Sequence, residues 1–227
     1  MCFDAASSLR TFSFATIIAL FLIWRNYPAD RVIGFTWLAV SAMQLAEYYM
    51  WTNQDCNSTN RAASIAAVLI LIIQPLALIA SIYYFGDSIL SKNVLGKATI
   101  VALIIAVVAI IYSIYRMTNQ KTVCTLPGKQ GYLDWDLNAF SGKNKTPLLL
   151  ALIFGLYYWG SSIFLFTLKP LSQGIIYFLM FTLSLLFSFA FTNYADKEWK
   201  SFWCWLINYM LVIPIIIGYL VNKKITF

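Results

Sequence analysis

Seven long apolar segments dominate the sequence, and they limit the chain to very few kinds of structure. They cover about residues 8–25, 32–52, 63–86, 98–116, 148–168, 171–192 and 201–222. A helix needs about 20 largely apolar residues to cross the hydrocarbon core of a bilayer, and each segment is close to that length. The sequence therefore predicts an all-α fold, a polytopic membrane helix bundle of about seven transmembrane helices.

The composition agrees with one membrane domain. Of the 227 residues, 61% are hydrophobic and only 11% are charged, whereas soluble domains are about half apolar and a quarter charged. We interpret residues 1–227 as a single transmembrane domain surrounded by membrane lipid. The connections are short except for a long non-membrane loop predicted at 117–147. The first apolar segment lacks the features of a cleaved signal peptide and is expected to remain as a helix.

The absence of histidine excludes several kinds of site. Histidine general bases, histidine metal ligands and Ser-His triads are all ruled out, and no CxxC pair suggests a zinc site. We expect no metal, no cofactor and no enzymatic activity; lipid chemistry using Glu47 with Asp134 or Asp136 is an alternative. The net charge of +7 is spread around the apolar segments, so no nucleic-acid partner is expected.

Charges at the segment ends bear on orientation. Seven spans place the termini on opposite sides, here named side A for the N-terminus and side B for the C-terminus. The basic residues divide nine to seven between sides A and B. Without four lysines of the long loop, the division becomes five to seven. An excess of Lys and Arg marks the cytoplasmic side, so side B is predicted to be cytoplasmic.

The cysteines support the same orientation. Cys2, Cys56, Cys124 and Cys204 all fall on or near side A. Four thiols on one face indicate two disulfides in an oxidising compartment, and three pairings are open. The triplet Asn57-Ser58-Thr59, also on side A, is a glycosylation sequon. The sequence therefore predicts an N-terminus outside the cell or in a lumen and a C-terminus in the cytoplasm.

Two prolines indicate an internal repeat. Pro75 lies near the middle of the third segment and Pro214 near the middle of the seventh. Matching helix breaks in two halves are typical of transporters with a central binding site. This interpretation gives a 3+1+3 arrangement, in which segments 1–3 and 5–7 are parallel repeats joined by the fourth segment. The alternative is that these prolines are coincidental, because proline is frequent in membrane helices.

Among the few strongly polar residues inside the apolar segments, five stand out: Ser41, Gln44, Glu47, Gln74 and Asn208. The first three recur every third residue and so share one side of a helix. Lipid offers them no partners, so they are expected to face other helices. We predict that all five form one polar track opening toward side A. Glu47 is the strongest functional candidate, because a carboxylate inside a membrane is costly; the alternative is that it ties helices together by hydrogen bonds.

Aromatic residues gather near the expected side A boundary, where they are typical of an interfacial belt. A cation-binding cage is the alternative interpretation. These residues are Tyr48, Tyr49, Trp51, Trp199, Trp203 and Trp205.

Four short motifs resemble an uncharacterised seven-span family of bacteria, algae and large DNA viruses. They are the start Met1-Cys2-Phe3, the segment Met43-Gln44-Leu45-Ala46-Glu47 followed by Trp51, the pair Gln74-Pro75, and Trp203-Cys204-Trp205 with Asn208. The resemblance covers most of the chain and implies that these polar residues act together, without implying a chemistry.

Two further resemblances concern architecture only. The repeat is similar to that of the PQ-loop transporters, although the chain has Gln74-Pro75 in the reverse order. Seven spans also resemble microbial rhodopsins, but residues 201–222 contain no lysine to bind retinal.

A small channel or transporter is the function that these features favour. Protons, cations or a small polar solute would pass along the track, with Glu47 as a titratable gate or binding carboxylate. The alternative is a non-transporting protein, either a receptor-like sensor or a membrane assembly scaffold. A homo-oligomer, in which copies of this chain bind one another, is a further alternative.

Overall fold

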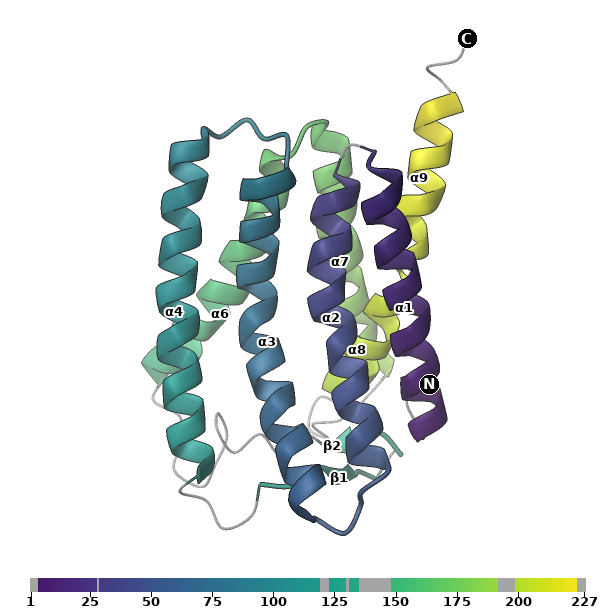
Figure 1. Ribbon diagram of the computed structural model, residues 1–227, viewed down its shortest axis with the longest axis vertical. Coiled ribbons are helices and arrows are strands. Elements are labelled where there is room, and N and C mark those ends of the chain that lie inside the picture. The colour runs from purple at the N-terminus through teal and green to yellow at the C-terminus, as the bar shows by residue number, and fades with distance from the viewer. Residues whose placement is uncertain are drawn as a thin grey trace.

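The protein is a bundle of long helices in this computed structural model, which describes residues 4–27, 29–118, 123–129, 131–134, 148–191 and 199–223. A row of four neighbouring helices comes first in the chain (Figure 1): α1 (Ala5–Arg25), α2 (Asp30–Trp51), α3 (Ser58–Phe85) and α4 (Lys92–Thr118). The second group comprises α6 (Leu148–Ile163), the 3-10 helix η1 (Phe164–Thr167), α7 (Leu171–Phe191), α8 (Trp199–Tyr209) and α9 (Val212–Lys223). In this group α7 lies behind α2, and α8 contacts both α1 and α2.

The predicted all-α fold is confirmed, and each of the seven predicted segments is largely helical. Among the described residues, four helices are long and apolar enough to cross a membrane: Ala5–Arg25, Ser58–Phe85, Lys92–Thr118 and Leu171–Phe191. Their outward surfaces are rich in large apolar side chains, and α4 in particular is mostly exposed. Such surfaces suit contact with lipid tails. These features are compatible with a membrane protein.

The last predicted segment is two helices instead of one. The chain turns at Met210 and Leu211, between α8 and α9. Pro214 lies in the first turn of α9, where its missing N–H costs least. The Ile213 amide N–H donates to the carbonyl of Met210, three residues earlier in the chain (3.0 Å). The predicted helix break near Pro214 therefore lies a few residues earlier in the chain.

Pro75 does not end its helix, because α3 continues from Ser58 to Phe85. The expectation of a break at Pro75 is therefore wrong. The Tyr157 hydroxyl donates to the Ile72 carbonyl (3.0 Å), so α6 supplies a hydrogen bond beside the proline. The two halves differ at the positions that suggested a repeat, and the 3+1+3 repeat stays a prediction.

A disulfide holds the side A end of the bundle together. Cys56 and Cys124 are bonded, with their Cα atoms 5.5 Å apart, so one of the predicted disulfides is confirmed. It joins the start of α3 to the segment before β1 (Leu126–Pro127), which pairs antiparallel with β2 (Leu133–Asp134). Cys204 is a buried free thiol in the part of the chain that the structure describes. Cys2 lies outside the described residues.

Asn60 reinforces this connection. Its side chain is fully buried. Its Nδ2 atom donates to the carbonyls of Asn53 and Thr125, both at 2.9 Å, and its Oδ1 atom accepts from the Thr125 amide N–H at 3.0 Å. The Ser64 and Thr125 hydroxyls also bond at 2.8 Å. These contacts hold residues around Thr125 against α3 in a defined position.

A buried ion pair holds the opposite end. Arg25 at the end of α1 bonds Asp30 at the start of α2 through two contacts, Nε–Oδ2 at 2.7 Å and Nη2–Oδ1 at 2.8 Å. The Arg25 side chain is 10% exposed and the Asp30 side chain 2%. Arg25 also donates to the carbonyls of Pro214 (3.1 Å) and Ile215 (3.2 Å). One guanidinium therefore connects α1, α2 and α9.

Close packing at Gly174 leads to a first prediction. A Cβ atom on Gly174 of α7 would lie 1.9 Å from the Leu165 carbonyl oxygen of η1. Gly174→Ala is expected to lower the free energy of unfolding by about 1–3 kcal/mol, because backbone must move to admit the methyl group. Thermal unfolding of the purified protein in one detergent measures the effect.

Gly160 provides the matched control for this prediction. Among the described residues, no atom outside its own helix backbone and chain neighbours lies within 4 Å of a Cβ atom added there. Alanine has a higher helix propensity than glycine, by about 1 kcal/mol. Gly160→Ala should therefore leave the unfolding temperature unchanged or raise it. Equal destabilisation by the two substitutions would contradict the packing argument.

Candidate functional site

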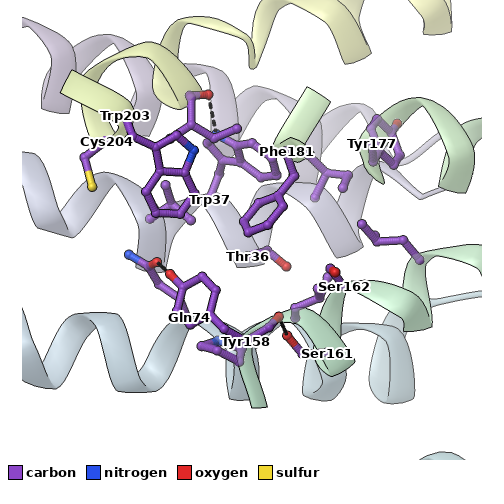
Figure 2. Close-up of a pocket in the computed structure, with 16 residues that line it drawn as sticks. Thr36, Trp37, Gln74, Tyr158, Ser161, Ser162, Tyr177, Phe181, Trp203 and Cys204 are labelled. Atoms are coloured by element: carbon purple, nitrogen blue, oxygen red, sulfur yellow. Dashed lines mark hydrogen bonds between the residues drawn. The ribbon is translucent and has the colours of Figure 1, made fainter. Parts of the chain in front are cut away.

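A cavity of about 60 Å³ lies between α2, α3, α6, η1, α7 and α8. A cavity needs roughly 10–15 Å³ of this kind of volume to hold one water molecule, so this one can hold several waters or a very small solute. Figure 2 shows side chains from facing helices gathered around it. The polar and aromatic residues of its wall include Thr36, Trp37, Gln74, Tyr158, Ser161, Ser162, Phe181, Trp203 and Cys204.

Gln74 is the predicted track residue that lines this cavity. The Tyr158 hydroxyl donates to its Oε1 atom, as Figure 2 shows. The Gln74 side chain is buried, and its Nε2 atom has no hydrogen-bond partner among the described residues. A buried polar atom without a partner costs about 1–3 kcal/mol. A bound solute or water that accepts a hydrogen bond would remove this cost.

Three hydroxyls in the wall give their protons to their own helices. Thr36 donates to the Val32 carbonyl, Ser161 to that of Tyr158 and Ser162 to that of Trp159, each at 2.7 Å. A hydroxyl oxygen that donates its proton retains lone pairs that can accept. The wall therefore offers acceptor oxygens in addition to the Gln74 donor.

Aromatic side chains make up much of the remaining wall. Trp203 is buried, and its Nε1 atom donates to the Ser184 hydroxyl (2.9 Å). The Trp37 Nε1 atom donates to the Ile207 carbonyl (3.3 Å), and Phe181 packs edge-on against Trp203 with ring centroids 5.4 Å apart. Trp203 therefore faces the interior of the bundle. The prediction that it belongs to an interfacial belt is wrong.

Gln44 and Glu47 form a buried pair outside the cavity lining. Both are fully buried, and the Gln44 Nε2 atom donates to the Glu47 Oε2 atom (2.8 Å). Val40, which lines the cavity, Gln44 and Glu47 are spaced by four and three residues, so they follow one face of α2. The pair therefore lies one to two turns from the cavity, toward side A.

Cys204 lies between the pair and the cavity. It lines the cavity and is close enough to Glu47 for an electrostatic interaction. The Cys204 carbonyl accepts a hydrogen bond from the Asn208 Nδ2 atom (2.7 Å), and the Asn208 Oδ1 atom is buried without a partner in the described structure. A change of charge at Glu47 would therefore alter the electrostatic environment of Cys204 on α8.

Ser41 does not join this arrangement. Its hydroxyl lies 3.3 Å from the Thr16 hydroxyl of α1. Residues three apart on a helix are turned by about 60°, so Ser41 is turned about 120° from Glu47. The prediction of one track along five residues is therefore wrong in detail. The described structure has a cavity at Gln74, a polar pair beside it, and a separate contact at Ser41.

Sequence reasoning missed Tyr158, Ser161 and Ser162, which complete the cavity, because Ser and Tyr are common in membrane segments. Asn57, the predicted glycosylation residue, is exposed and caps α3 by accepting from the Asn60 amide N–H (3.0 Å). Within the described ranges, no group of three or more Cys, Asp or Glu residues is placed to hold a metal.

Comparison with known proteins finds no family model, no curated protein and no solved structure that matches the chain.

Proposed function

We propose that the protein is a seven-span membrane channel or transporter that passes a small polar solute or ion through the interior of its helix bundle. The observation that carries the proposal is the cavity, whose lining includes Gln74, a residue whose buried Nε2 atom has no partner among the described residues. Pathways for ions and polar solutes are marked by buried polar groups that face the inside of a bundle.

The three remaining spans are α2, the α6–η1 pair and the α8–α9 pair. All three contribute to the cavity wall, which accounts for their polar residues and their interruption. Individually, α6, α8 and α9 have 16, 11 and 12 residues, so these two spans reach membrane length only when both members of each pair are counted together. The proposed orientation has side A outside or in a lumen, where the disulfide between Cys56 and Cys124 forms most readily.

In this proposal Glu47 acts as a gate. The Gln44–Glu47 pair lies on the cavity face of α2 and interacts with Cys204 in the cavity wall. Gain or loss of a proton by Glu47 changes the charge beside α8 and so alters the packing of α8 against the cavity. A proton or a solute entering from side A would reach Glu47 before the cavity.

Glu47→Gln is expected to abolish gated flux, because glutamine keeps the acceptor for Gln44 but cannot change its charge. The purified protein is reconstituted in liposomes that contain a pH dye, and flux is recorded under ion gradients and a membrane potential. Asp87→Asn is the matched control, since this exposed carboxylate forms only a surface contact with Lys169. Wild-type flux that survives Glu47→Gln in a folded protein would overturn the role of Glu47.

The ordered side A end favours a second candidate, a receptor-like sensor or assembly scaffold. The disulfide and the Asn60 hydrogen bonds present the β1–β2 hairpin as a fixed surface, and such a surface suits a protein partner. Absence of flux from folded wild-type protein would favour this candidate. Its direct test is co-purification of a partner that is lost when residues 126–134 are replaced.

A further inference from the structure

The charge of the cavity wall limits what the cavity can hold. None of the described lining residues is Asp, Glu, Lys or Arg, and Glu47 lies outside the lining. An ion that enters an apolar region loses its hydration shell, and without an opposite charge nearby the free energy of that loss is not recovered. The wall therefore favours an uncharged occupant over a bare ion.

The hydrogen-bonding groups of the wall define the occupant further. The Gln74 Nε2 atom can donate, because it has no hydrogen-bond partner among the described residues, whereas the Oε1 atom already accepts from Tyr158. The hydroxyl oxygens of Thr36, Ser161 and Ser162 can accept, because their protons are directed to backbone carbonyls. A complementary molecule has one acceptor and several donors.

From these features we infer that the cavity takes a small neutral amide, a molecule with one carbonyl oxygen and several N–H groups, of which urea is the simplest. The carbonyl oxygen accepts from Gln74, and the N–H groups donate to hydroxyl oxygens across the cavity. The size agrees, since about 60 Å³ suits an occupant of only a few heavy atoms. The inference rests on the proposed function, in that the cavity forms part of the pathway.

The test measures urea efflux from liposomes by stopped-flow light scattering, with potassium and proton flux recorded on the same preparation. Gln74→Met removes the donor with little change in volume. Loss of a hydrogen bond to a buried group costs enough to slow urea about tenfold or more. Gln173→Met is the matched control, because Gln173 is a buried glutamine of α7 that lies outside the cavity lining.

Urea efflux in wild type that falls in Gln74→Met and persists in Gln173→Met would support the inference. If Gln74→Met does not fold, Thr36→Val replaces it, since this change removes an acceptor oxygen without changing the shape of the side chain. Ion flux without urea efflux would overturn the inference and leave the proposed function intact. No flux of urea, potassium or protons from folded protein would overturn the proposed function as well.

Discussion

Asp30→Ala is expected to lower the free energy of unfolding by about 3–5 kcal/mol. The substitution leaves the guanidinium of Arg25 buried without its carboxylate, and breaking a buried ion pair from one side costs about that much. It also removes the acceptor for the Tyr27 amide N–H (3.0 Å). Thermal and denaturant unfolding in a single detergent, together with the monodispersity of the purified protein, measures the loss.

Two comparisons separate burial from the loss of a charge. Asp87→Ala removes the carboxylate of an exposed pair in which Lys169 is 53% and Asp87 74% exposed; exposed pairs contribute about 1 kcal/mol or less. The double substitution Arg25→Met with Asp30→Leu removes both charges and should recover part of the loss. Recovery stays incomplete, because Arg25 also donates to the carbonyls of Pro214 and Ile215. Similar effects of Asp30→Ala and Asp87→Ala would contradict the structural role of the buried pair.

Cys56→Ser is expected to lower stability by about 4 kcal/mol. The disulfide links positions 68 residues apart, and a cross-link that closes a loop of this length removes several kcal/mol of entropy from the unfolded chain. The same loss should follow reduction of the wild-type protein. Unfolding temperature with and without reductant, and gel mobility under both conditions, provide the measurement.

Cys204→Ala serves as the control for this substitution. The Cys204 thiol is buried and free in the described structure, so its removal should leave the mobility shift on reduction unchanged. The response of Cys56→Ser to reductant should be lost. A wild-type protein that unfolds at the same temperature with and without reductant would show that Cys56 and Cys124 do not form the stabilising bond.

The sequence predicted the helices well because each is a long apolar run, and membrane-length hydrophobicity is a strong local signal. The ends of α2 and α7 lie within two residues of the predictions. The division of the last segment was predicted at Pro214 but lies at Met210 and Leu211, since Pro214 marks a break only approximately. Proline restricts the backbone near it but does not determine the residue at which the chain turns.

The candidate site was predicted only in part, because it depends on contacts between distant segments. Burial of Ser41, Gln44 and Glu47 was predicted correctly. The separation of Ser41 from the other two residues follows from the packing of α1, and the pairing of Gln74 with Tyr158 joins residues 84 positions apart. The Arg25–Asp30 pair was also missed, because charged residues at segment ends usually remain in water and here α9 covers them.

The length of α3 bears on how the bundle sits in a bilayer. Its 28 residues extend about 42 Å, whereas the hydrocarbon core is about 30 Å thick. An upright α3 would therefore project by about 12 Å in total beyond the acyl chains. If most of that excess lies at its first turns, Asn60 and the cross-link at Cys56 reside among lipid headgroups and water. In a thicker membrane, α3 would need less tilt to fit its length to the hydrocarbon core. Bilayer thickness would therefore change the exposure of the β1–β2 hairpin with no change in sequence.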